Sequence, residues 1–567
     1  MARTSSIPKA NERTTPLAAD PTTLNAVRWA VGVVAAVLVV RFVLTAWLAL
    51  GDVTESRYAT IALHMQRTGG LVTPWVWFDG TLLPFWGKPP LYFWLTAASF
   101  GLLGVSEWTS RLPGLLAGAA TLAMVFAFAR RTWGLRVAAV ATTVLASSLL
   151  FFVLTGVSTT DMALAGAMTA SMAAFARTVA AEGPRARRWW GVALAASLAA
   201  GSLVKGPIAV VIPGASIFLW LALARRWRLL ARVPWLTVAG VFVVATVPWY
   251  LLAERATPGF LRYFLINEHV LRYIKPAYGD LYGSGNVSPR GTIWAFLLAG
   301  GLPWTGLAVA ALVRSFRAAR RDPAGGADPW LSYAVLWGVT PALFFTLARQ
   351  ALPSYPLPGL PGLALATGAA LVGWMDSESR RSLARSLAGH LLGIAVLLGG
   401  IAWFGMRQHA PAWVVAVTAV SAVVVLGMGR RFWVRNDSVA LTGALGLAAV
   451  LLVVAAVGLY RPAIEDEYST KTIISRLHTD AATAGRTPVF PFRTPYSASF
   501  YAEVAGGPAV EQHSSKGPPY LDERLRSGRD DVFVFNVRDW TVLGTALRDR
   551  LRVVLRTENW VACLPAS

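Results

Sequence analysis

Long apolar runs recur along most of the chain, and they restrict it to one class of fold. A helix of about 20 apolar residues crosses the hydrocarbon core of a bilayer. The first run, AVRWAVGVVAAVLVVRFVLTAWLAL at 26–50, is longer than that. Of the 567 residues, 55% are hydrophobic and only 14% are charged, which is not typical of a soluble protein. The sequence therefore predicts an α-helical polytopic membrane protein.

Arginine clusters between the apolar runs predict how the chain is threaded. Cytoplasmic loops of membrane proteins are enriched in Lys and Arg, so clusters separated by two runs share the cytoplasmic side. Six clusters follow this pattern, at 130–136, 185–188, 225–232, 314–321, 379–385 and 430–435. The apolar runs lie at 26–50, 89–107, 110–129, 137–155, 161–181, 189–204, 207–224, 233–253, 291–313, 330–348, 355–375, 384–405, 411–429 and 438–460.

The N-terminus carries Lys9 and Arg13, with Arg28 at the start of the first apolar run, which places the N-terminus in the cytoplasm. Only one crossing then fits between residues 51 and 130, so the run 89–107 is expected to lie at the outer interface or to dip in and out. About thirteen transmembrane helices remain, and the C-terminus is outside. The alternative, an outer N-terminus, reverses the arginine bias only for the first 25 residues.

Three domains follow from this threading. They are a cytoplasmic tail (1–25), a transmembrane domain (26–460) with outer loops 51–109 and 254–290, and a tail domain (461–567). Alternating segments such as VFVFNV and an early helical stretch predict that the tail domain is a small α/β domain. The formal net charge of +23 is explained by the positive-inside loops, so no nucleic-acid partner is expected. The single cysteine, Cys563, excludes an intramolecular disulfide, and no metal-ligand spacing is present.

The first outer loop contains acids and one isolated lysine. Asp52 and Glu55 directly follow the first apolar run, where they either begin a helix near its positive dipole or take part in chemistry. Lys88 stands before two prolines and an aromatic run, where it either snorkels to the interface or binds an anionic group. The stretch ESRYATIALHMQ is amphipathic, and one helical face carries Tyr58, Ile61, Ala62 and Met65.

Further charged residues stand at other outer boundaries. Asp161 enters an apolar segment, which makes it a functional candidate. Lys205 lies between two apolar runs, and because Pro207 suits the first position of a helix, Lys205 is expected at a helix start, where the dipole does not favour a cation. The loop 254–290 is aromatic and basic, with its ionisable candidates at His269, Arg272 and Lys275, and is long enough to act as a lid. Arg349 and Tyr355 stand at another outer boundary.

Six motifs then carry a family resemblance by their order and spacing. They are TESRYATIA (54–62), KPPLYFWL (88–95), SRLPGLLAG (110–118), TDMALA (160–165), LVKGPIAVVIPG (203–214) and LPSYPLPGLPGLAL (352–365). The chain resembles the GT-C integral-membrane glycosyltransferases, which use polyprenyl-phosphate-linked sugars. Within them it looks like the lipid A 4-amino-4-deoxy-L-arabinose transferase group, with protein O-mannosyltransferases further off. A GT-C fold with about thirteen helices and a periplasmic C-terminal domain is the implied architecture.

The resemblance also implies residue roles. Glu55 and Asp161 stand at the positions of the catalytic carboxylates. The donor phosphate would be bound by Lys88, Lys205, Tyr355 and Arg272. Supporting positions are Asp52, Arg57, Tyr58, His269 and Arg349. Two departures concern the sugar: Thr54 stands where the aminoarabinose transferases usually carry Asp, and Gly87 where they often carry Glu.

The implied activity is transfer of a sugar from undecaprenyl phosphate to an acceptor at the periplasmic face of the bacterial inner membrane. The resemblance implies lipid A as the acceptor, and protein or glycan hydroxyls are the alternative. No cofactor or divalent metal is expected, because cations and a hydroxyl can stabilise the leaving phosphate. A membrane transporter is the rival from another class. It would carry ionisable residues near the bilayer midplane and repeat-related broken helices, whereas the apolar runs here are nearly free of acids in their middles and show no internal repeat.

Overall fold

The computed structural model describes residues 21–275, 281–282, 287–321, 328–376, 412–435, 445–451, 469–514 and 516–566, with isolated positions between 392 and 468. Several predictions lie wholly or largely outside these residues. They are the N-terminal tail, the apolar runs 384–405 and 438–460, and parts of the loop 254–290 at 276–280 and 283–286.

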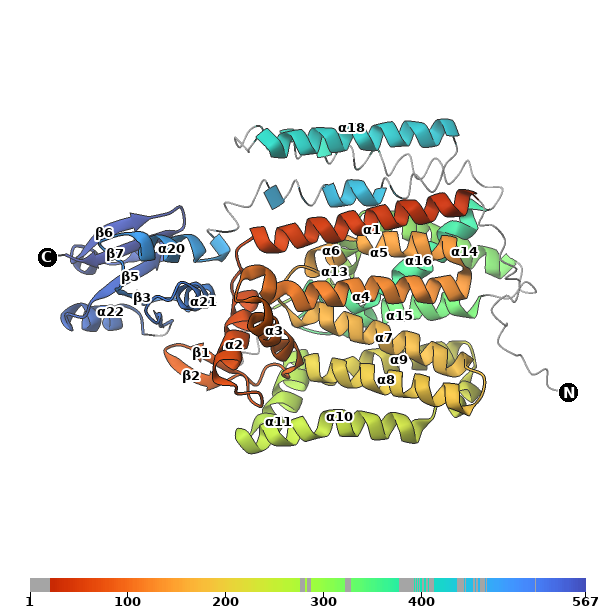
Figure 1. Ribbon diagram of the computed structural model, residues 1–567, viewed down its shortest axis with the longest axis horizontal. Coiled ribbons are helices and arrows are strands. Elements are labelled where there is room, and N and C mark those ends of the chain that lie inside the picture. The colour runs from red at the N-terminus through yellow and green to blue at the C-terminus, as the bar shows by residue number, and fades with distance from the viewer. Residues whose placement is uncertain are drawn as a thin grey trace.

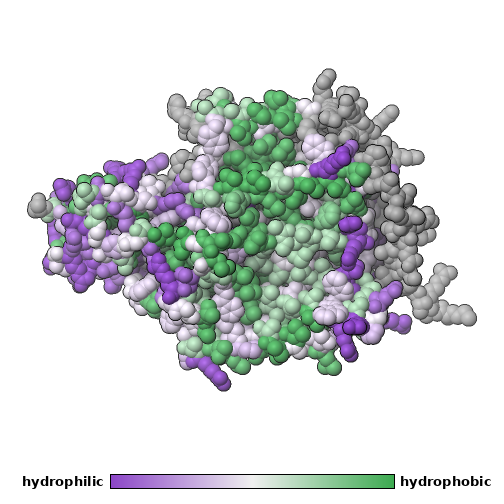
Figure 2. Space-filling view, viewed as in Figure 1, coloured by the Kyte–Doolittle hydropathy of each residue, from purple (hydrophilic) through white to green (hydrophobic). Residues whose placement is uncertain are grey.

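The described chain forms a bundle of helices with a small sheet domain at one end (Figure 1). Figure 2 shows a band of hydrophobic residues across the bundle, between the hydrophilic C-terminal domain and a hydrophilic edge at the opposite end. Such a belt is what a helical bundle presents to lipid. The prediction of a polytopic helical membrane protein with a small C-terminal α/β domain is confirmed.

The helices of the bundle are joined by short turns in some places and by the two long outer loops in others. In chain order they are α1 (Pro21–Trp47), α4 (Glu107–Trp133), α5 (Leu135–Ala146), α6 (Leu149–Leu154), α7 (Thr160–Ala180), α8 (Pro184–Lys205), α9 (Ile208–Leu223), η1 (Trp227–Arg232), α10 (Trp235–Ala256), α13 (Thr292–Gly300), α14 (Thr305–Arg321), α15 (Pro329–Phe345), η3 (Leu357–Gly359), α16 (Leu360–Met375) and α18 (Ala412–Arg435). Local signals set some of the boundaries. Ser106 and Thr109 form a capping box before α4, and Asp328 caps α15 with Pro329 at its first position.

Five helices in the described residues are long and apolar enough to cross a membrane, and a bent pair can form a sixth span. That pair is α13 and α14, which meet at an angle of 100°. The apolar run 291–313 therefore does not form one straight helix, because Pro303 at the break has no N–H to donate. The run 137–155 is likewise divided into α5 and α6. The number of thirteen spans stays a prediction.

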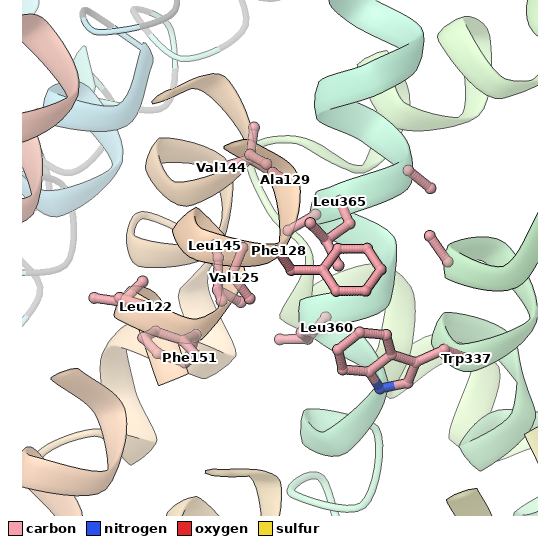
Figure 3. Packing of buried hydrophobic residues seen from close by; sticks show 14 of the residues in the cluster. Leu122, Val125, Phe128, Ala129, Val144, Leu145, Phe151, Trp337, Leu360 and Leu365 are labelled. Carbon is pink, nitrogen blue, oxygen red and sulfur yellow. The ribbon is translucent and has the colours of Figure 1, made fainter. Parts of the chain in front are cut away.

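The core of the bundle lies where α4 and α5 meet α15 and α16 (Figure 3). Phe128 and Trp337 are among the buried aromatic residues there. Glycines bring α15 and α16 close together, since a Cβ on Gly362 would stand 2.7 Å from the Ala334 carbonyl oxygen. The proline- and glycine-rich motif 352–365 thus packs one helix tightly on another, and this packing fixes the segment that precedes it.

Before α4, the first outer loop folds into a short layer at the end of the bundle that faces the C-terminal domain (Figure 1). Its elements are α2 (Thr54–Thr68), a hairpin of β1 (Trp75–Phe78) and β2 (Thr81–Pro84), and α3 (Leu91–Leu103). The predicted apolar face of α2 is buried at Tyr58, Ile61, Ala62 and Met65. With 13 residues, α3 is about 20 Å long, which is shorter than a bilayer core, as its assignment to the outer interface requires.

The second outer loop follows α10. It contains α11 (Phe260–Arg262), the π-helical segment η2 (Tyr263–Leu271) and α12 (Arg272–Ile274). The two carboxylate oxygens of Glu254 accept from the backbone amides of Gly259 and Leu261, at 2.9 and 2.7 Å. These bonds turn the chain back from α10 toward the first loop.

The C-terminal domain is a five-stranded mixed sheet in the order β4-β3-β5-β7-β6. Strands β3 (Thr487–Phe490), β4 (Glu511–Gln512) and β5 (Asp531–Asn536) pair in parallel, whereas β6 (Leu551–Arg556) and β7 (Trp560–Pro565) are antiparallel. Cys563 is fully buried in β7 opposite Phe533. The helices of the domain are α20 (Lys471–Thr479), α21 (Tyr496–Val504), α22 (Gly517–Arg526), α23 (Val537–Val542) and α24 (Thr545–Arg548).

This domain packs on the first outer loop through an apolar cluster. Leu50, Leu63 and Phe100 from the membrane part share that cluster with residues of α20 and α21 such as Ile473 and Phe500. Polar contacts border it. Lys471 forms an ion pair of 2.5 Å with Glu107, and the backbone amide of Leu50 donates to the Tyr501 hydroxyl at 2.7 Å. The C-terminal domain is thus held directly against the segment that carries Glu55 and Lys88.

Candidate active site

Asp161 and Lys205 form an ion pair across two helix ends. Lys205 Nζ donates to Asp161 Oδ1 at 2.5 Å, and each side chain is 15% exposed. Asp161 lies in the first turn of α7, where a carboxylate suits the helix dipole. The expectation that Lys205 begins a helix is wrong, because Lys205 is the last residue of α8. There the dipole favours a cation, so both charges suit their helix ends.

A second ion cluster joins the two outer loops through Glu268. Lys88 Nζ donates to Glu268 Oε1 at 2.6 Å, and Arg272 Nη1 donates to both oxygens of the same carboxylate at 2.9 Å. Burial alone would raise the pKa of Glu268, but Lys88 and Arg272 overcome it and hold that pKa at about 2. One carboxylate therefore aligns two cations, although it neutralises only one of their charges.

These two clusters are neighbours. The charge of Lys88 acts on Asp161, and the Ser354 side chain lies close to the same carboxylate. The Tyr355 ring lies 5.4 Å from Lys205 Nζ. The structure thus brings four sequence-predicted residues from four separate segments to one place.

His269 closes this group from the second loop. Its Nδ1 lies 2.6 Å from the Phe264 carbonyl oxygen, and the ring lies close to the backbone of Lys205. Burial lowers the pKa of His269, and the nearby Lys88 lowers it further. The imidazole is therefore neutral near pH 7, which suits a hydrogen-bonding role more than a charged one.

Glu55 occupies a different environment. Both of its oxygens bind the Arg111 guanidinium, at 2.7 and 2.8 Å, and they also accept from the backbone amides of Gly51 and Ser158. Burial alone would raise the pKa of Glu55, but the Arg111 charge and these hydrogen bonds hold it below its usual value. Four donors fill the acceptor positions of this carboxylate, so a proton cannot reach it unless one of them leaves.

Other predicted positions support the loops rather than the ion clusters. Asp52 accepts from the Ser497 backbone amide at 2.8 Å and from its hydroxyl at 2.5 Å, which ties the first loop to the C-terminal domain. The Arg57 guanidinium lies between aromatic rings, 5.2 Å from that of Phe85 and 5.6 Å from that of Tyr496.

Tyr58 and Arg349 also lie in packed surroundings. Tyr58 is buried edge-on against Phe93, with ring centroids 5.3 Å apart. The backbone of Arg349 accepts from the Ser288 amide at 2.9 Å and donates to the Tyr273 carbonyl at 3.3 Å. These bonds hold the second outer loop beside the segment that leads to Tyr355.

Sequence reasoning missed two partners of the predicted residues. Arg111 lies within the motif 110–118, and an arginine inside an apolar run signals a buried partner. Glu268 stands four positions before Arg272, the spacing of a helical ion pair, and that signal was readable. Within the described residues, no group of three or more His, Cys, Asp or Glu side chains gathers as a metal site.

A protein in which helix ends and outer loops gather cations at one face of a helical membrane bundle can bind an anionic group carried by a lipid. The crystal structure of ArnT from Cupriavidus metallidurans bound to undecaprenyl phosphate has the same overall fold, with a TM-score of 0.76 over 94% of this chain and 97% of that one. Its sequence identity is 24%. The chain therefore has the GT-C glycosyltransferase fold, as the motifs predicted.

Sequence comparison agrees. Residues 30–264 match the family model of dolichyl-phosphate-mannose-protein mannosyltransferases. The undecaprenyl phosphate-α-4-amino-4-deoxy-L-arabinose arabinosyl transferase of Edwardsiella ictaluri is 29% identical over 352 residues, which are 61% of this chain and 59% of that protein. A second transferase of this name, from Sodalis glossinidius, is 30% identical over 63% of this chain and 62% of its own length. The chain thus matches about three fifths of these relatives, and it resembles the aminoarabinose transferase group.

Proposed function

We propose that this protein transfers a sugar from an undecaprenyl-phosphate carrier to an acceptor at the outer face of the bacterial inner membrane. The first candidate is transfer of 4-amino-4-deoxy-L-arabinose to lipid A. The names of the relatives from Edwardsiella ictaluri and Sodalis glossinidius support this sugar and this carrier. The active site would face the periplasm, on the side of the C-terminal domain.

One observation carries the proposal: Lys88, Arg272 and Lys205 converge with Tyr355 around two carboxylates. Three cations and two acids leave one positive charge uncompensated in a partly buried site, and burying such a charge is costly. A phosphodiester carries one negative charge and would balance it. This also gives Lys88 a reason to stand beside an apolar, aromatic run.

The proposed reaction breaks the bond between C1 of the sugar and the oxygen of the carrier phosphate. The electron pair of that bond stays with the phosphate, whose growing charge Lys88, Arg272 and Lys205 stabilise, with a hydrogen bond from Tyr355. A phosphate of lipid A, already an anion, would attack C1 without a general base. Asp161 would then orient Lys205 and stabilise positive charge on the sugar. We expect no requirement for a divalent metal. Measuring transfer activity in the presence of excess chelator tests this expectation.

A second acceptor class is favoured by a different observation, the match of residues 30–264 to protein mannosyltransferases. A protein or glycan hydroxyl must lose its proton as it attacks, so this reaction needs a general base within hydrogen-bond reach. Asp161 is the better placed carboxylate, because Glu55 already accepts from Arg111 and two backbone amides.

Mass spectrometry of lipid A from the native host tests the proposal. Cells with the gene, without it, and without it but carrying Lys88→Ala on a plasmid should be compared. We expect a pentosamine mass on lipid A only in the first. A lipid A that is the same in all three would refute lipid A as the acceptor, and glycoproteomics of the same cells would then test the hydroxyl acceptors.

A further inference from the structure

The hairpin β1–β2 connects the predicted phosphate-binding lysine to the C-terminal domain. Lys88 follows the end of β2 by four positions, so the place of its backbone depends on where the hairpin stands. The strands pair from Trp75 opposite Pro84 to Phe78 opposite Thr81. A hairpin of two four-residue strands is marginal by itself and needs outside contacts to hold its position.

The tip of this hairpin is bound by the C-terminal domain. Asp79 has a positive φ of 51°, and its Oδ1 accepts from the backbone amide of Ser514 at 2.5 Å and from the Ser514 hydroxyl at 3.3 Å. Ser514 follows strand β4 by two positions, and the preceding His513 amide donates to the Phe490 carbonyl of β3 at 2.8 Å. The tip is therefore bonded to residues that are themselves fixed to the sheet.

The contact is also sterically tight. Gly80 has a φ of 77°, and a Cβ built there would overlap the ring of His513. That ring is buried and packs edge-on against Tyr520, with centroids 4.2 Å apart. This contact and the burial of the ring limit the room that the imidazole has to move away. Only a residue without a side chain allows the tip of the hairpin to pack this closely against His513.

The base of the hairpin is held from other directions. The Tyr282 hydroxyl donates to the Pro84 carbonyl at 2.5 Å and accepts from the Trp86 amide at 2.8 Å. Tyr496 of the C-terminal domain joins the aromatic cluster in which Phe85 packs, just before Lys88. The segment that leads to Lys88 is thus fixed at its tip and at its base.

We propose that the C-terminal domain positions Lys88 for the donor phosphate, through the contacts of Asp79 with Ser514 and of Gly80 with His513. This inference rests on the proposed function for the role of Lys88, whereas the mechanical link is independent of what the protein transfers. The tip residues are positioning residues. They act on the donor site only through the hairpin.

A glycine substitution with a matched control tests the link. Gly80→Ala introduces a methyl group against His513, whereas Gly69→Ala changes a glycine of the same outer loop with a φ of 69° and no atom within 4 Å of its Cβ. Both variants place an alanine in a left-handed backbone conformation and share that cost. The difference between their effects therefore reports only the contact of residue 80 with His513. A double variant that combines Gly80→Ala with His513→Ala removes the obstructing ring, so the hairpin should again pack against the C-terminal domain.

Two readouts are needed on the full-length protein. Hydrogen exchange of residues 75–88 reports whether the hairpin is held, and binding of undecaprenyl phosphate together with the kcat and KM for its sugar ester reports on Lys88. For Gly80→Ala we expect faster exchange and a KM raised on the order of tenfold or more, since misplacing a binding group by about 1 Å has effects of this size. Gly69→Ala should match the wild type within about twofold, and the double variant should recover most of the loss.

The outcomes separate the two proposals. Faster exchange in Gly80→Ala with unchanged binding and KM would overturn the positioning role. Unchanged exchange in Gly80→Ala, or equal effects in both glycine variants, would overturn the link itself. A wild-type protein that does not bind undecaprenyl phosphate would refute the proposed function and with it the role of Lys88. Selective loss in Gly80→Ala with rescue by His513→Ala supports the inference.

Discussion

Replacing Glu55 with glutamine distinguishes a carboxylate that holds the fold together from one that takes part in the reaction. The variant keeps the shape of the side chain but leaves the Arg111 guanidinium, which is 3% exposed, without its counter-charge. Removing one partner of a buried ion pair typically costs about 3 to 5 kcal/mol. Arg111 keeps its bonds to the carbonyl oxygens of Thr45, Leu48 and Ala49. We therefore expect the lower end of that range, about 3 kcal/mol.

The assay is thermal unfolding of the purified protein in detergent, followed by transfer activity at a temperature at which wild type and variant are both folded. Glu55→Gln should lower the melting temperature strongly and keep most of its activity below it. Glu107→Gln is the matched control. Its carboxylate lies at the same face and pairs with the 41% exposed side chain of Lys471, and such a pair contributes about 0 to 1 kcal/mol.

The opposite pattern would refute the structural role. If Glu55→Gln melts like the wild type and yet transfers no sugar, Glu55 reacts directly and its four hydrogen bonds must rearrange during turnover. A paired replacement gives an independent check. Glu55→Leu with Arg111→Leu removes both charges, so it should be more stable than Glu55→Leu alone.

Three other predictions follow from the ion clusters and the domain contact. Lys88→Ala should lower the rate of sugar transfer on the order of a hundredfold or more, because it removes a cation that stabilises the leaving phosphate. The circular dichroism spectrum should stay unchanged, because Glu268 still pairs with Arg272. Replacement of the exposed Arg556 by alanine is the control, and wild-type activity of Lys88→Ala would exclude the proposed site. Glu268→Gln should cost about 3 kcal/mol at pH 7, the lower end of the range for a buried ion pair that loses one partner. Since the pKa of Glu268 is held at about 2, this difference should persist to pH 5 and shrink only in stronger acid; a difference lost already at pH 6 would contradict it. Burial raises the pKa of Asp52 to about 6, so the folded protein binds a proton on the Asp52 carboxyl more tightly than the unfolded chain does. The contribution of Asp52 to stability therefore falls as the pH rises from about 4 to 6. Asp52→Asn should flatten melting temperature against pH in this window, and parallel curves would rule this out.

Features that depend only on residues close together in the sequence could be predicted from it. The apolar runs predicted a helical membrane protein, and the spacing of Tyr58, Ile61 and Met65 predicted the buried face of α2. The alternation in the tail predicted its sheet. Each of these follows from a periodicity that burial imposes on neighbouring residues.

Pairings between distant segments were not readable in the same way. Glu268 and Lys88 are 180 positions apart, and Glu55 and Arg111 are 56 apart, so only the packing of the loops brings them together. The end of α8 was misplaced because Pro207 indicated a new helix without showing that the previous helix continues to Lys205. The break between α13 and α14 was missed because a continuous apolar run gives no angle.

The buried thiol in the C-terminal sheet makes spectroscopic work on this protein simpler. Cys563 is the only cysteine, it is inaccessible in β7, and burial raises its pKa to about 12. A thiol that is neither exposed nor ionised does not react with maleimide or iodoacetamide probes at neutral pH. A single cysteine introduced at the exposed Thr81 of the hairpin can therefore be labelled selectively without removing the native one. The approach of a lipid substrate to this loop could then be followed in real time in reconstituted membranes.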